Sequence, residues 1–273
     1  MTLQTIKQQR MRRIATLLSL LAIAIINPTL ARAQATQSLV QQEVEQEKRV
    51  PDEDDIIHQT VSVSSPYYYT NLMLKYRNGT AQLSDLEYYY LYYGYMYDEN
   101  YRPFSENDAL DRMLLVMAGI NPDAPTMMQL ESLIENGVAA MEIDPFNPKV
   151  LNIMAYAYGA LGDTRREQLY YNHLNGILST IESTGTGLKE EERWHVLMFS
   201  HAYDLLASKE YSYGESRIIS RNAMFIPIAQ RPKERIKGFY FDYSRIYRNK
   251  PDNVTIKRDR TWQINNLKPR EYK

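Results

Sequence analysis

The chain of 273 residues contains no cysteine, and this absence removes several kinds of chemistry at once. Disulfide frameworks, thiol nucleophiles, cysteine-ligated zinc and c-type haem attachment all need this residue, as does lipid attachment behind a leader peptide. Phosphate-cradling glycine loops, His-Glu-x-x-His and Gly-x-Ser-x-Gly motifs are missing as well. We therefore expect no cofactor and no metal, and an enzyme is the less favoured class.

The first 33 residues have the pattern of an export leader. Basic residues precede an apolar run from Ile14 to Ile26, and Ala31-Arg32-Ala33 is the small-x-small pattern that signal peptidase reads. The apolar run is shorter than the roughly 20 residues that a bilayer core requires. We expect cleavage after Ala33 and a periplasmic or extracellular protein, without stable membrane insertion of the mature chain.

Charge is distributed unevenly along the chain. Removing residues 1–33, which hold five of the 32 basic residues and no acidic one, leaves 27 bases and 33 acids, a net charge of −6. Residues 67–208 carry nineteen acids and nine bases, whereas residues 209–273 carry sixteen bases and seven acids. Either the basic segment meets an anionic partner, or the two parts attract each other, which is the simpler interpretation. The net negative charge of the chain without residues 1–33 argues against nucleic acid as a ligand.

Residues 34–65 are predicted to be a disordered acidic linker. Their sequence includes QQEVEQEKRVPDEDD, which is rich in glutamine and acids and has no aromatic residue. Such a composition buries too little apolar area to offset the entropy of ordering it. The alternating TVSVSS at its end is a weak signal for an edge strand.

Residues 66–208 carry successive helix signals. Ser84 with Glu87, and Thr126 with Gln129, have the spacing of capping boxes. Asn147-Pro148 places a cap before a proline at the first helical position. The predicted helices cover residues 67–77, the stretch after Ser84, and residues 108–118, 127–143, 148–160, 164–182 and 190–207.

After residue 208 the pattern changes from helical to β-like. Short β-branched or aromatic runs occupy residues 224–228, 238–243, 254–257 and 262–264, with turn-like stretches such as NKPDN between or beside them. These runs predict a small C-terminal antiparallel β element in residues 209–273, packed on the helices.

The stretch MEIDPFNPKVLNIMAYAYGALGDTRREQLYYNHL resembles a tetratricopeptide repeat, a helix–turn–helix unit of 34 residues. Leu151, Ala155 and Tyr158 match the first helix, and Gly162-Asp163 matches the turn. Glu167 departs from the pattern because a small residue is expected there. The resemblance implies a mainly α (α+β) fold, with tetratricopeptide-like antiparallel helical hairpins ahead of the β element.

A broader resemblance extends from about Ser65 to Tyr247. It is carried by SPYYYTNLMLKYRNG, LSDLEYYYLYYGY, WHVLMFSHAYDLL and GFYFDYSRIY. These strings together resemble a family of secreted Bacteroidetes proteins catalogued as domain of unknown function 4919. That family has no established activity, so the resemblance implies export and a helical-then-strand layout and carries over no catalytic residue.

Twelve of the 23 tyrosines fall within residues 67–101, most of them on the helix after Ser84. Helical spacing divides the rings between two faces, with Tyr90, Tyr93 and Tyr97 on one and Tyr88, Tyr92 and Tyr95 on the other. An aromatic core is the favoured interpretation. If the second face is exposed, its rings suit stacking on sugars or contact with peptides.

His201 and Asp204 lie three residues apart and share one face of a predicted helix. They could act as a ligand pair or an acid–base dyad, although no third ligand lies nearby in the sequence. A hydrogen-bonded pair at the edge of the core is the commoner explanation.

The sequence therefore predicts an uncharacterised exported protein, most simply a non-enzymatic protein- or peptide-binding scaffold of the bacterial envelope. Its partner would be another envelope protein or a peptide. One alternative is a glycan-binding module that uses exposed tyrosines. The other is a hydrolase whose carboxylates are not identified.

Overall fold

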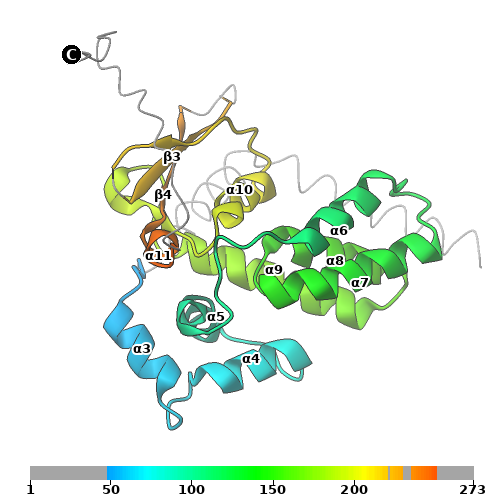
Figure 1. Cartoon of the computed structure of the whole chain (residues 1–273), viewed down its shortest axis with the longest axis horizontal. Helices are drawn as coiled ribbons and strands as arrows, with labels where there is room; N and C mark the ends of the chain where they lie inside the picture. The colour runs from blue at the N-terminus through cyan, green and yellow to red at the C-terminus, as the bar shows by residue number, and fades with distance from the viewer. Residues whose placement is uncertain (1–47, 221, 230–234, 251–273) are drawn as a thin grey trace, which may run out of the picture. The chain divides into compact units, whose positions relative to one another are not determined.

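The computed structural model describes residues 48–220, 222–229 and 235–250. The chain divides into the units Met1–Glu47 and Lys48–Lys273, and the first lies outside the described residues, as do the predicted leader and the predicted strands at 254–257 and 262–264. The described helices of eight or more residues are α3 (Glu53–Val61), α4 (Tyr69–Asn78), α5 (Asp85–Gly94), α6 (Asp108–Ala118), α7 (Met127–Ile143), α8 (Pro148–Ala160), α9 (Thr164–Glu182) and α10 (Phe199–Ser208) (Figure 1).

Several helices begin where their local sequence predicts. The Glu87 amide donates to Ser84 Oγ at 3.3 Å while the Ser84 amide donates to Glu87 Oε2 at 2.8 Å, which completes the capping box of α5. Thr126 and Gln129 do the same for α7. These caps satisfy amides that have no partner inside a helix, and the residues that supply them are only three apart.

The prediction of a disordered linker over 34–65 is wrong for its described C-terminal part, because α3 occupies Glu53–Val61. The Asp52 carboxylate caps this helix, and Ile56 is fully buried. Arg248 holds α3 from the other end of the chain, donating from both guanidinium Nη atoms to Glu53 at 2.5 and 2.8 Å. Ser62–Ser65, within the weak strand signal, form no strand.

Helices α6 to α9 form consecutive helix–turn–helix pairs, and α8 packs against α9 and α7 (Figure 1). Glu167 fits the α8–α9 contact because it faces Gly159. A Cβ atom on Gly159 would lie only 2.8 Å from the Glu167 carboxyl carbon, so the glycine supplies the space that a small residue would otherwise supply. The large side chain of Glu167 in α9 is therefore accommodated by the absence of a side chain at Gly159 in α8.

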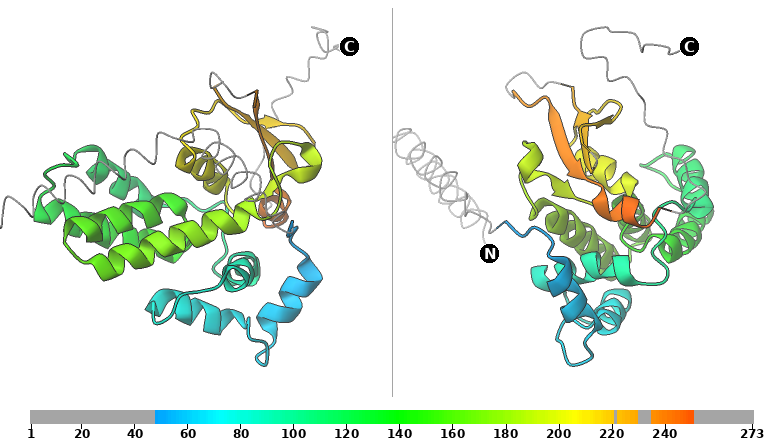
Figure 2. Two further views of the ribbon diagram at one scale, coloured as in Figure 1. Left: turned by 180° about the vertical axis from the view of Figure 1, so that it is seen from behind. Right: turned by 60° about the vertical axis from the view of Figure 1, so that its left-hand side comes forward.

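Helix α5 lies at the centre of the larger of two apolar clusters. It packs against α3, α4 and α9, and every residue from Tyr88 to Gly94 is buried. Helix α9 extends from the α6–α8 helices to the sheet (Figure 2), so it contributes to both clusters. Because other elements surround α5, this helix must be apolar on all sides.

The C-terminal β element is a small mixed sheet. Its strands are β1 (Trp194–His195), β2 (Arg217–Ile218), β3 (Ala223–Pro227) and β4 (Gly238–Asp242), in the order β1-β4-β3-β2. Strands β3 and β4 lie at two of the predicted runs and are antiparallel as predicted. Strand β2 was not predicted and pairs antiparallel with β3, whereas β1 pairs with β4 in parallel, with Trp194 opposite Phe241. A short helix α11 (Ser244–Arg248) follows β4.

The predicted helix over 190–207 is correct only in its second half. A 3₁₀ helix covers Glu190–Glu192 and β1 follows it, before α10 begins at Phe199. Trp194 stacks on Phe239 at 4.8 Å between ring centroids, and this contact with the sheet overrides the local helical pattern. The mainly α, α+β class is confirmed.

Candidate functional site

Tyr88, Tyr92 and Tyr95, the candidates for an exposed recognition face, are 4%, 0% and 3% exposed. The core interpretation of the tyrosine stretch is therefore correct, and a glycan surface made of these three rings is excluded. Tyr97, assigned to the inner face, is instead 37% exposed. The reason is that α5 ends at Gly94 and continues as a 3₁₀ helix over Tyr95–Tyr97, which changes the angle between successive side chains.

Several buried tyrosine hydroxyls of α5 and of the segment after it bond to distant segments, whereas the buried hydroxyls of Tyr69 and Tyr243 have no hydrogen-bond partner among the described residues. Tyr93 and Tyr101 donate to the carbonyls of His195 and Leu197, and Tyr95 donates to the carbonyl of Ile143. Burying a hydroxyl without a partner is costly, whereas a tyrosine that reaches a carbonyl adds a large apolar ring at little penalty. The tyrosines thus join α5 to its surroundings.

His201 is bonded to Asp144 rather than to Asp204. Its Nε2 lies 3.0 Å from Asp144 Oδ2, and its Nδ1 lies 2.9 Å from the hydroxyl of Tyr92. The Leu197 amide donates to the same hydroxyl at 3.1 Å. The Asp144 carboxylate therefore accepts from Nε2.

Asp204 has a different partner, the ammonium group of Lys149 at 3.1 Å from Oδ1. Burial raises the pKa of Asp204, and the nearby lysine opposes that shift. His201 and Asp204 share a helix face, as predicted, but both are almost fully buried and do not form a dyad with each other. No group of three potential ligands able to hold a metal occurs within the ranges that the structure describes.

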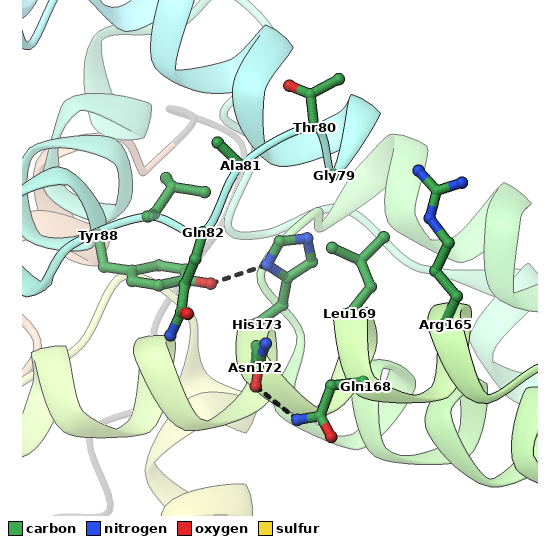
Figure 3. Close-up of a pocket in the computed structure, with 11 residues that line it drawn as sticks. Gly79, Thr80, Ala81, Gln82, Tyr88, Arg165, Gln168, Leu169, Asn172 and His173 are labelled. Atoms are coloured by element: carbon green, nitrogen blue, oxygen red, sulfur yellow. Dashed lines mark hydrogen bonds between the residues drawn. The ribbon is translucent and has the colours of Figure 1, made fainter.

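A pocket of about 360 Å³ opens where the loop between α4 and α5 crosses α9 (Figure 3). Its volume is at the lower end of the range for ligand pockets. Residues 79–83 form one wall. The other wall is the face of α9 that carries Arg165, Gln168, Leu169 and Asn172, which are spaced by three and four residues and so point the same way.

Two glycines set the spacing between the loop and α9. Gly79 ends α4 in the left-handed conformation, with φ of 58°, and a Cβ atom there would lie 2.7 Å from Leu169 Cδ2. Gly176 lies beneath the ring of Tyr88, where a Cβ atom would approach to 2.4 Å. The absence of both side chains lets the loop and α5 approach α9 closely while the pocket stays open between them.

The inner wall of the pocket is closed by His173. Its Nδ1 lies 2.9 Å from the Tyr88 hydroxyl and its Nε2 lies 3.0 Å from the Tyr76 carbonyl. Because a carbonyl only accepts, Nε2 carries the proton and Nδ1 accepts from Tyr88. Burial disfavours the charged ring and lowers the pKa of His173 to about 4. His173 is therefore neutral, and both of its nitrogens are occupied.

The outer part of the pocket is polar and has few internal bonds. Gln168 Nε2 donates to Asn172 Oδ1 at 2.8 Å, and Gln168 Oε1 and both hydrogens of Asn172 Nδ2 have no partner among the described residues. The side chains of Thr80 and Gln82 are exposed. In the part of the chain that the structure describes, no hydrogen bond involves the backbone N–H or C=O groups of Thr80 to Leu83. The pocket therefore offers unpaired donors and acceptors to a ligand.

Sequence reasoning did not single out the pocket residues. Arg165, Gln168 and Asn172 look like the solvated face of an ordinary helix, and only the crossing of the loop at Gly79 turns that face into a wall. A detectable signal was the short GTAQL connection, which begins with the helix-ending Gly79 and has no helix or strand pattern of its own.

A family model described as Domain of unknown function (DUF4919) matches residues 54–252, which is more than half of the chain. The chain belongs to this family. The DUF4919 region includes the helices α4, α5 and α9 and thus the whole pocket. No curated protein and no solved structure matches the chain. None of the described helices has the length and apolar character of a membrane span.

Proposed function

We propose that this DUF4919 protein is a non-enzymatic module that binds a peptide segment of a partner protein in the pocket between residues 79–83 and α9. The observation that carries the proposal is the set of unpaired polar groups along this pocket, on both its loop wall and its helix wall. Apart from Leu83, the residues that carry these groups are accessible to solvent, so a ligand can replace water at them.

The other titratable candidates do not favour a hydrolase. His173 and His201 have both ring nitrogens occupied inside the protein, and Asp204 is ion-paired and nearly buried. A general acid or base must come within hydrogen-bonding distance of the substrate. The pocket walls instead present amides, a hydroxyl and a guanidinium, which bind and orient without taking or giving protons at neutral pH.

The proposed setting is the bacterial envelope. The support for export is the leader pattern ending at Ala33, and the support for a scaffold related to tetratricopeptide repeats is the α8–α9 hairpin with its Gly162-Asp163 turn. Helical hairpins of this kind present extended surfaces to protein partners, although fold analogy alone does not establish a function.

The proposal is tested on an array of random dodecapeptides, with a polysaccharide array beside it. We expect the wild-type chain to be retained on a subset of peptides, and the double variant Gln168→Ala, Asn172→Ala to lose that retention. Asn175→Ala is the matched control because it removes an exposed amide from the same helix outside the pocket. Retention on polysaccharides alone, or peptide retention unchanged in the double variant, would contradict the proposal.

A further inference from the structure

We infer that the peptide bound by this pocket is an extended segment that presents a carboxylate to Arg165, and that its main chain pairs with residues 80–83. The inference rests on the proposed function and adds the chemistry of the ligand. Three features of the pocket carry it: the backbone of one wall, the amides of the other, and the charge at one end (Figure 3).

The loop wall is an unpaired stretch of backbone. Thr80 to Gln82 are exposed, with Thr80 and Ala81 in a bend, and Ser84, two residues after Gln82, is extended, with φ of −77° and ψ of 166°. Every non-proline residue carries one strong donor and one strong acceptor, and none of the four residues 80–83 is a proline. A peptide laid along such a stretch gains main-chain hydrogen bonds whatever its side chains are, as in strand addition to a sheet edge.

The helix wall complements an extended main chain. Gln168 and Asn172 lie one turn apart on α9 and are joined by a hydrogen bond. The remaining carbonyl oxygen of Gln168 and the amide NH₂ group of Asn172 then offer one acceptor and two donors side by side. Peptide groups present the same two kinds of partner, so one peptide unit can be bonded from both walls.

The charge of the pocket is set by Arg165 alone, because its lining includes one arginine and no acidic residue. The neighbouring cations are already neutralised: Arg166 is paired with Asp163 at 2.6 Å, and Lys75 with Glu87 at 2.7 Å. No ion pair of Arg165 is found among the described residues. Its planar guanidinium matches a carboxylate in a two-bond arrangement, which is the reason for assigning the ligand an acidic group.

A sugar is the less suitable occupant. Sugars bind by stacking on exposed aromatic faces, and the aromatic ring in this pocket, Tyr88, is 4% exposed with its hydroxyl bonded to His173. Leu169, which is half-buried, offers apolar surface for a small side chain rather than a ring face.

The experiment uses three hexapeptide libraries, because a carboxylate can come from a chain terminus or from a side chain. The first has free C-termini and contains no Asp or Glu. The second has amidated C-termini and contains Asp and Glu. The third is amidated and lacks Asp and Glu, so it has no carboxylate.

We expect the first or the second library to give binders, and the third to bind at least about tenfold more weakly, as expected for loss of a charged hydrogen bond. The library that binds identifies the source of the carboxylate. Equal binding by the third library would overturn the carboxylate assignment and leave the proposed function intact. Binding by none of the three would overturn the proposed function itself.

Variants and modified peptides test the two remaining contacts. For a peptide with a carboxylate, Arg165→Gln should raise Kd about tenfold, and Arg166→Gln, which removes the same charge one residue away but outside the lining, by less than about twofold. Equal increases in Kd for the two variants would mean that Arg165 acts only through the general positive charge of this region. That result would contradict the inference.

Methylation of peptide nitrogens tests main-chain pairing. In an extended pair, alternate residues face the partner, so methylation at one parity should weaken binding about tenfold and at the other parity by less than about twofold. If methylation at both parities is tolerated, the pairing with residues 80–83 is wrong.

Discussion

Helix α5 and the pocket on α9 use their hydrogen-bonding groups in opposite ways. Around α5, the hydroxyls of Tyr92 and Tyr93 bond to partners inside the protein, and the rings fill the core. Along the pocket, Gln168, Asn172 and residues 80–83 have donors and acceptors without a partner among the described residues. The difference teaches that the conspicuous tyrosines hold the fold together, while the inconspicuous amides are available for function.

The largest effect on this comparison should come from Tyr92→Ala. The ring is fully buried against Tyr93 and Phe146, and its hydroxyl bonds both His201 and the Leu197 amide. We expect the free energy of unfolding in urea to fall by about 4 kcal/mol, from the cavity and the unpaired groups left behind. Tyr171→Ala, a control at a ring 52% exposed on α9, should change it by less than about 0.5 kcal/mol. Similar small losses in both variants would contradict the assignment of Tyr92 to the core.

The next largest effect should be a loss of stability with acidity, caused by His173. Its folded-state pKa of about 4 lies below the unfolded value near 6.5, so the native state excludes a proton that the unfolded chain binds. The contribution of His173 to the free energy of unfolding is therefore fully present above about pH 6.5. It falls as the pH is lowered toward 4, by at most about 3 kcal/mol.

His195, whose pKa is also lowered to about 4 by burial, titrates over the same interval. Urea unfolding at pH 7 and pH 5 should therefore show a smaller difference for His173→Gln than for the wild type. If the change in unfolding free energy between pH 7 and pH 5 is the same in the variant and the wild type, His173 is not held neutral in the folded protein.

A smaller effect is expected from Gly176→Ala. The new methyl group would lie 2.4 Å from the ring of Tyr88, which its bond to His173 prevents from moving freely. Overpacking costs about 1–3 kcal/mol and the helix gains up to about 1 kcal/mol from alanine, so a net loss of about 1–2 kcal/mol is expected in the free energy of unfolding. Asn175→Ala, at the preceding exposed position, should not destabilise the protein. An equal loss of unfolding free energy in that variant would show that the contact with Tyr88 does not cause the loss in Gly176→Ala.

The smallest effect should come from the pocket itself. Gln168→Ala and Asn172→Ala should each change the free energy of unfolding by less than about 0.5 kcal/mol, because their mutual bond is on the surface. Thermal unfolding of both variants checks this. A loss of unfolding free energy above about 1 kcal/mol would mean that these amides stabilise the fold. They would then not differ from the tyrosine hydroxyls of α5 in this respect.

The sequence was sufficient where structure depends on near neighbours. Ser84 with Glu87, and Thr126 with Gln129, cap α5 and α7 as their spacing predicts, because the atoms involved are only three residues apart. It was insufficient where partners are remote. Helix α3 is fixed by Arg248, 195 residues away from Glu53, and β1 exists only because β4 lies beside it.

The candidate site shows the same limit. The pairing of His201 with Asp144 joins residues 57 apart, so the sequence favoured the nearer Asp204. The pocket depends on how closely a loop crosses α9, which two glycines decide through contacts with Leu169 and Tyr88. Neither distance can be read from periodicity or composition.

The hydroxyl bonds of α5 have a consequence for the order in which the protein folds. Tyr88, Tyr93 and Tyr92 bond to residues 85, 102 and 109 positions further along the chain. Contacts of such wide sequence separation must wait for long loops to close, which slows folding. During synthesis, α5 can acquire these partners only after His201 has left the ribosome, so the tyrosine-rich half of the chain remains without its core until the histidine-bearing half is made.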